Sequence, residues 1–370
     1  MKKMKPHYLV KKSNRHAPAR LSLRVSQAGF SLVELMVGLV IGLLATLVIM
    51  QVFSAFEGQK RTTSGTSDAQ TAGNISIYSV TRDLQLAGYG LPVMETTNSS
   101  LGCTVFSPAG TNLSPVTIVD GGAGASDTIT VRYGSTAAGG FAIKVTDVTN
   151  KAAGVVGVDN NISCQVGDRA LIVNGNNCVL QTVTGPTQIA NPPINTGDTT
   201  HYELDNAANA NIIINANISC LGTWTQNTYT INANQLALNG GAIADGIVNL
   251  QAQYGVSAVA NSNVVTNWVN AAGIWAPAAL TPATRNRIKA VRVALVARNE
   301  LREKVVVTNT CTTAKGVVNT GPCAWDDTAV DAAPQINISN LGVDWQNYRY
   351  RTYETIIPIR NIIWSSDKLS

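Results

Sequence analysis

The chain has 370 residues, enough for one large domain or two modest ones with a real core. Only 13% of its residues are charged, and the formal net charge of +5 comes from the N-terminus. Residues 1–29 contain eight of the 27 basic residues and no acidic one, which leaves 19 basic against 22 acidic residues in the remainder, a net charge of −3. The body of the chain therefore offers no electrostatic basis for binding nucleic acid.

A long apolar segment follows the basic one. Residues 35–56 are uncharged and mostly apolar, and as a helix they are long enough to cross a bilayer of about 30 Å. The basic stretch before them predicts a cytoplasmic N-terminus by the positive-inside rule. Glu34 stands at the start of this segment, where a carboxylate is either a functional group or a residue of the headgroup boundary. The apolar segment has three interpretations: a cleaved secretory signal, a plain uncleaved anchor, or the segment that follows a signal cut before it.

The stretch Gly29-Phe30-Ser31-Leu32-Val33-Glu34 resembles the class III signal of type IV pilins and type II secretion pseudopilins. The resemblance implies that prepilin peptidase cuts between Gly29 and Phe30 and methylates the new amino group of Phe30. Glu34 then becomes the fifth residue of the mature chain, and the apolar helix is retained. The leader is longer than those of type IVa pilins, which indicates a later translation start or a leader of the type IVb kind.

Cleavage gives Glu34 a physical partner. The new amine of Phe30 is a cation in or near the membrane, and Glu34 lies four residues further on, on the same side of a helix. The resemblance implies that Glu34 meets the amine of a neighbouring subunit and sets the axial register between helices. Gly38 and Gly42 form a GxxxG pattern that lets helices approach closely, although glycine is also simply tolerated in membrane helices.

The helix is predicted to continue beyond the membrane and to pack on a head domain. Gly88, Gly90 and Pro92 predict its end, so that one helix covers about residues 31–87. Its two parts are 30–56, which form the membrane span and filament core, and 57–88, which are amphipathic. Apolar and small residues recur at helical spacing along one face of the second part: Ala69, Gly73, Ile77, Val80, Leu84 and Ala87.

Residues 89–370 read as a periplasmic β-rich head. Short strand-like runs end in turn residues at 126–134, 168–175, 178–185 and 200–206. A longer run lies at 287–300, and the run at 348–364 closes the chain. Asn- and Gly-rich stretches near 110–125, 190–200 and 206–217 are predicted surface loops. The expected fold class is α+β: a pilin fold with a long N-terminal helix and a large, disulfide-containing antiparallel β head.

Six cysteines all follow the apolar segment, and none forms a CxxC pair. Because His201 is the only histidine beyond the leader, this spacing favours disulfides in an oxidising compartment over a metal site. We expect a disulfide first between Cys311 and Cys323, because it closes a short loop, and second between Cys164 and Cys178. Cys103 and Cys220 are then the two cysteines left to pair. Six cysteines allow 15 connectivities, so the longer pairings stay open. We expect no metal and no cofactor.

The resemblance extends to the other end of the chain. Residues 82–90, 246–256, 288–298 and 348–364 are similar to blocks of PilW-type minor pilins. Tyr and Arg alternate over 348–353, a pattern of single-stranded nucleic-acid binding or of a strand with aromatic and arginine side chains on opposite faces; the second is favoured because no other basic cluster joins it. Asp326 and Asp327 beside Trp325 are expected in a solvated turn. No GxSxG, HExxH or Walker motif is present, so we expect no enzyme.

The resemblance implies a minor pilin that helps to initiate type IV pilus assembly and enters the fibre at its tip, supporting twitching motility, adhesion or DNA uptake. The resemblance implies several partners: prepilin peptidase, other minor pilins, the major pilin, a large tip adhesin and the inner-membrane assembly platform. The alternatives are a J-type minor pseudopilin of type II secretion and a membrane-anchored periplasmic binding protein. Direct DNA capture would need a basic patch that the composition does not supply.

Overall fold

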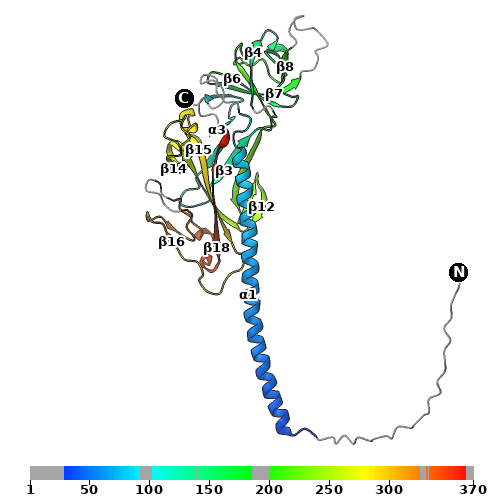
Figure 1. Cartoon of the computed structure of the whole chain (residues 1–370), viewed down its shortest axis with the longest axis vertical. Coiled ribbons are helices and arrows are strands. Elements are labelled where there is room, and N and C mark those ends of the chain that lie inside the picture. Colours follow the sequence, from blue (N-terminus) through cyan, green and yellow to red (C-terminus); the bar gives the residue numbers. More distant parts are fainter. Residues whose placement is uncertain are drawn as a thin grey trace, which may run out of the picture. The chain divides into compact units, whose positions relative to one another are not determined.

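The computed structural model describes residues 29–91, 102–137, 140–185, 200–325, 331 and 333–363. The leader up to residue 28, Pro92, most of the loop expected at 190–200 and the expected turn at Asp326-Asp327 lie outside these ranges. The chain forms two compact units, with the division between Gln59 and Lys60. One helix, α1 (Leu32–Leu86), supplies residues to both units (Figure 1).

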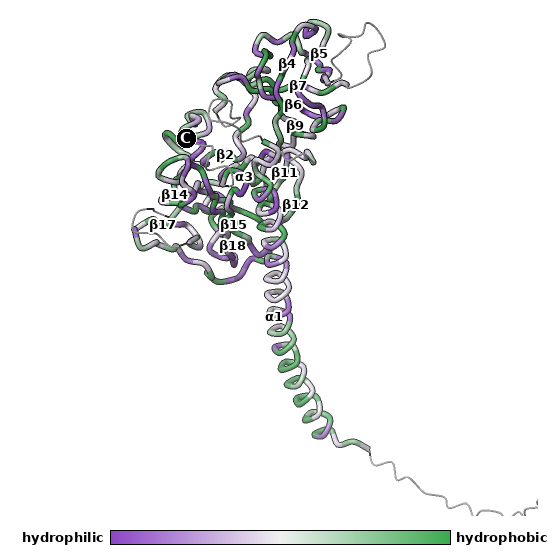
Figure 2. Tube along the Cα trace, turned by 45° about the horizontal axis from the view of Figure 1, so that its top comes forward, coloured by the Kyte–Doolittle hydropathy of each residue, from purple (hydrophilic) through white to green (hydrophobic). Residues whose placement is uncertain are grey.

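The first unit exposes the apolar part of α1. Every described side chain from residue 29 to residue 59 is exposed, including large ones such as Phe30, Leu39 and Phe53. Figure 2 colours most of this part of the helix as hydrophobic. α1 contains a stretch long and apolar enough to cross a membrane. An apolar surface of this extent marks contact with a membrane or with other protein.

The part of α1 in the second unit buries one face, as predicted. Ala69, Val80, Leu84 and Ala87 are at most 9% exposed, and they belong to the largest core of the head. The helix ends at Leu86, one residue before the predicted end. Gly88 and Gly90 follow with φ of +77° and +81°, a left-handed conformation that glycine adopts without steric cost and that stops a helix.

Two antiparallel sheets form the part of the head around that core (Figure 1). The five-stranded sheet has the order β12 (Gly241–Asp245), β11 (Gln235–Leu238), β10 (Thr225–Asn232), β3 (Thr128–Tyr133), β2 (Val116–Val119). The four-stranded sheet has the order β14 (Asn267–Val269), β13 (Ile247–Val256), β15 (Ile288–Arg298), β18 (Tyr350–Pro358). The shorter elements are β16 (Cys311–Thr312), β17 (Val318–Asn319), α2 (Pro282–Arg285), α3 (Arg360–Ile363), η3 (Gly273–Trp275), η4 (Ser339–Leu341) and η5 (Trp345–Asn347).

A six-stranded closed sheet is inserted between β3 and β10. These two strands pair with each other, with Tyr133 opposite Thr225, so the insertion leaves and rejoins the chain at one place. The strands follow the order β7-β6-β9-β4-β5-β8, and β8 pairs back to β7. The strands of this closed sheet are β4 (Ala142–Asp147), β5 (Val155–Val158), β6 (Arg169–Asn174), β7 (Asn177–Gly185), β8 (His201–Leu204) and β9 (Asn217–Gly222). A further strand, β1 (Val105–Ser107), pairs in parallel with β7, and a short 3-10 helix, η2 (Lys151–Ala153), precedes β5.

All six predicted strand runs contain strands, namely β3, β6, β7, β8, β15 and β18. One loop prediction is wrong, because the stretch 110–125 contains β2. Ile118 of β2 is fully buried, since the strand pairs with β3 and adds to the core of the head. The predicted run 348–364 also ends differently: β18 stops at Pro358, and α3 follows after one residue.

The cysteines form three disulfides, and two of the expected pairings are wrong. The structure contains the expected Cys311–Cys323 bond. Cys164, however, pairs with Cys220, and Cys103 pairs with Cys178. Cys164 precedes β6, whereas Cys178 lies opposite Val173 near the other end of that strand, so the two are separated by the length of β6. Pairing of β1 with β7 brings the Cys103 segment to Cys178 instead.

Candidate assembly site

The predicted cleavage bond lies just outside α1. Gly29 and Phe30 precede the helix in irregular backbone, and the Phe30 side chain is 79% exposed. The first intrahelical hydrogen bond runs from the Leu35 amide to the Ser31 carbonyl, at 3.1 Å, which makes Ser31 the N-cap residue. A bond outside regular structure and not buried is open to a peptidase.

Glu34 lies in the first turn of α1, at the third position after Ser31. A carboxylate there interacts favourably with the positive end of the helix dipole, so Glu34 has a local role before any assembly. Ser-x-x-Glu before an apolar run is also the sequence pattern of a capping box. The prediction from sequence did not use this pattern, although it gave the helix start at about residue 31, in agreement with α1.

One groove on the first unit contains four of the predicted site residues. It runs along α1 and is lined by Phe30, Glu34, Gly38 and Gly42, with Thr46 one further step along. Glu34, Gly38, Gly42 and Thr46 recur every four residues, so each is the neighbour of the one before it on the helix surface, and the groove turns slowly around α1. A Cβ atom built on Gly38 or Gly42 meets no atom within 4 Å, so nothing in the described chain covers the two glycines. The groove presents a carboxylate, two bare stretches of backbone and apolar flanks.

Small residues seat the second part of α1 against the four-stranded sheet. A Cβ built on Gly65 would lie 2.1 Å from Oδ1 of Asn299, and one on Gly73 would lie 2.1 Å from Cε2 of Tyr353. The Tyr353 hydroxyl also donates a hydrogen bond to the Ala69 carbonyl at 3.3 Å. These contacts fix how the sheet meets the helix.

Tyr353 also lies on the same face of β18 as Arg351, because the Arg351 guanidinium lies over the Tyr353 ring. The prediction that aromatic and arginine side chains lie on opposite faces of this strand is therefore wrong at Tyr353.

A buried carboxylate, Asp83, joins α1 to the five-stranded sheet. It is 4% exposed, and it accepts hydrogen bonds from the Tyr229 hydroxyl at 2.6 Å and from Nδ2 of Asn227 at 2.7 Å. Burial, together with the carboxylate of Asp83, raises the pKa of Tyr229, which keeps its hydroxyl a donor. Asp83 was not among the predicted residues, although an acid between Val80 and Leu84 on an apolar face was a signal for it.

The other predicted site residues belong to the second unit. The six cysteines are in the head, and His201 begins β8 in the inserted sheet. Among the described residues, no group of three or more His, Cys, Asp or Glu side chains is placed to hold a metal ion.

Comparison with known families matches both ends of the chain. Residues 24–50 match the prokaryotic N-terminal methylation motif, and residues 214–361 match the family described as Type IV Pilus-assembly protein W. The second match covers β9 to β18 and leaves the other five strands of the inserted closed sheet outside it. The comparisons with curated proteins and with solved structures found no match.

A methylation motif at the start of an exposed apolar helix, followed by a mainly antiparallel, disulfide-bonded β head, defines a pilin. The second family match gives its type. The chain is a type IV pilus minor pilin of the PilW type with a class III signal.

Proposed function

We propose that this pilin joins other minor pilins in the complex that initiates the pilus and then lies at the tip of the fibre, where it supports motility, adhesion or DNA uptake. Before assembly it is anchored in the inner membrane by residues 30–56, with a cytoplasmic leader (1–29) and a periplasmic head (89–370) on the amphipathic residues 57–88. Prepilin peptidase removes the leader and methylates Phe30. Its family matches support a structural rather than a catalytic role.

The groove along the first turns of α1 is the observation that carries this proposal. Its Glu34 is the counter-charge for the Phe30 amine of a neighbouring subunit, and the two charges offset each other's desolvation in an apolar surrounding. Gly38 and Gly42 leave room for the neighbour's helix to come close to the backbone. The exposed apolar side chains around them pack first against lipid and then against other helices of the fibre.

The proposal predicts that Glu34→Ala leaves the chain cleaved and in the membrane but absent from fibres. Removing one partner of a buried charge pair strands the other charge, at a cost of about 3–5 kcal/mol. Glu57→Ala is the matched control, because Glu57 is an exposed glutamate of the same helix outside the groove. The measurement is the amount of each variant in the membrane and in the sheared surface fraction. Recovery of the Glu34 variant in fibres at the control level would contradict the proposal.

A deletion strain tests the system that the chain serves. We expect loss of surface pili with protein secretion intact, and restoration of pili by the unchanged chain. Intact pili with lost secretion would instead assign the chain to a type II secretion system.

A further inference from the structure

The second unit has a pocket on each flank of α1, between Gly65 and Ile75. One pocket, of about 380 Å³, is lined by Asp68, Asp245 and Glu300 together with Arg298. The other, of about 440 Å³, is lined by Thr66, Asn299, Arg349 and Arg351, among others, and we call it the Arg351 pocket. Because successive residues of an α-helix are about 100° apart, Thr66 and Asp68 point to nearly opposite flanks. One flank of the helix is therefore acidic and the other basic.

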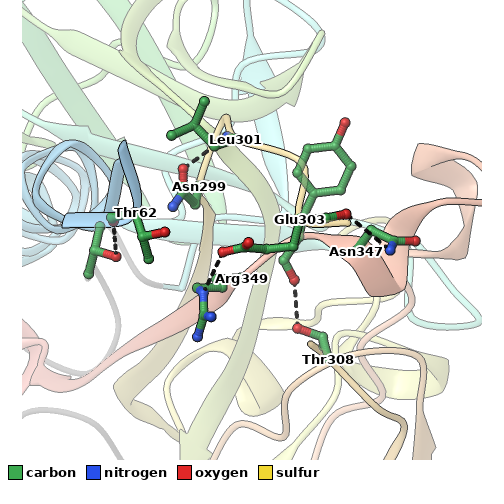
Figure 3. Close-up of polar contacts among 9 residues, drawn as sticks. Thr62, Asn299, Leu301, Glu303, Thr308, Asn347 and Arg349 are labelled. Atoms are coloured by element: carbon green, nitrogen blue, oxygen red, sulfur yellow. Dashed lines mark hydrogen bonds and ion pairs between the residues drawn. The ribbon is translucent and has the colours of Figure 1, made fainter. Parts of the chain in front are cut away.

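The charge of the Arg351 pocket is only partly compensated. Its described lining includes two arginines and no acidic residue. Nε of Arg349 contacts Oε1 of Glu303 at 3.0 Å, as Figure 3 shows. Arg351 is exposed and lies over the ring of Tyr353, and no acidic side chain of the described residues is within ion-pair distance of it. The Arg351 guanidinium thus leaves its planar set of donors available to a ligand.

Asn299 adds a buried donor at the same place. Its side chain is 2% exposed, and its Oδ1 accepts a hydrogen bond from the Leu301 amide at 2.9 Å. Nδ2 has no hydrogen-bond partner among the described residues. Figure 3 shows this nitrogen on the side of α1, away from Leu301. A buried donor without an acceptor costs free energy, so an acceptor that reached it would be bound favourably.

We propose that the Arg351 pocket binds a carboxylate side chain on the head of a neighbouring pilin. A carboxylate matches the fork of an arginine, and a second oxygen can accept from an amide donor such as Nδ2 of Asn299. We infer a protein segment as the occupant, because the opposite flank of α1 carries the complementary acidic groups, and a pilin with such a flank fits the pocket when subunits contact head to tail. Such complementary charges set orientation and partner choice. This inference rests on the proposed function, which places the chain beside other pilins.

The test is site-specific photocrosslinking of the full chain in its own cells. The probe replaces Val307, a half-buried residue of the Arg351 pocket. We expect a crosslink to another pilin at a segment that contains Asp or Glu. Arg351→Glu should reduce the yield at least about tenfold, the scale expected when a close charge pair is broken, and Arg351→Lys should reduce it less. Arg302→Glu is the matched control, because Arg302 is an exposed arginine paired with Asp344 outside the pocket.

Two further readings separate this inference from the proposed function. Leader cleavage and recovery in sheared fibres report the proposed function, and protection of all six cysteines from alkylation reports that each variant is folded. If folded Arg351→Glu in fibres crosslinks as well as the Arg302 control, the pocket does not bind a neighbour's carboxylate. Exclusive crosslinking to a protein other than a pilin, or crosslinks only to segments without acidic residues, also overturns the inference.

Discussion

Gly73→Ala is expected to loosen the contact between α1 and the four-stranded sheet. The added Cβ would lie 2.1 Å from Cε2 and 2.4 Å from Cζ of Tyr353, so the ring must move. Overpacking costs about 1–3 kcal/mol. The hydrogen bond from Tyr353 to the Ala69 carbonyl is worth about 1 kcal/mol, and the helix propensity of Ala over Gly returns about the same. The free energy of unfolding of the head should fall by about 1–3 kcal/mol.

The assay is denaturant unfolding of the detergent-solubilised full chain, followed by the fluorescence of its six tryptophans, all of which lie beyond residue 200. Gly58→Ala is the matched control: it is in the same helix, its Cβ meets no atom within 4 Å, and the transition of the head should not change. In a double-mutant cycle, Tyr353→Ala should absorb much of the effect of Gly73→Ala, since it removes the clashing ring. Stability of Gly73→Ala equal to wild type, or full additivity with Tyr353→Ala, would refute the reasoning.

Two carboxylates of the second unit give further predictions. Asp83→Ala removes the acceptor of Tyr229 and Asn227 and should lower the free energy of unfolding by about 2–4 kcal/mol, measured by the same unfolding assay; a loss below about 1 kcal/mol would contradict this. Burial raises the pKa of Asp127 to about 7, so its contribution to stability is full below its ordinary pKa of 3.8 and is lost as pH rises through 7. Asp127→Asn should be less stable at pH 5 because one of two accepted amide bonds is lost, and should show a flatter stability profile between pH 5 and 8; an unchanged slope would refute the assignment.

The limits and faces of α1 could be predicted from the sequence because they depend on neighbouring residues. The apolar run, the small and apolar residues at helical spacing and the glycines after Leu86 act within a few turns of one helix. The same holds for the motif at Gly29 to Glu34 and for the Cys311–Cys323 bond, which closes a 12-residue separation. Local geometry is sufficient to determine each of these.

Only the tertiary structure decided the features that join distant segments. Closure of β7 on β8, the crossed Cys103–Cys178 and Cys164–Cys220 bonds, and the meeting of Asn299 with Gly65 all depend on contacts between residues far apart in the chain. Local propensities are similar for many alternative pairings of short strands, so they do not determine which strands pair. The observed pairing depends on how much apolar surface the complete core buries. The two charged flanks of α1 arise in the same way, because their residues come together only when the sheets have packed on the helix.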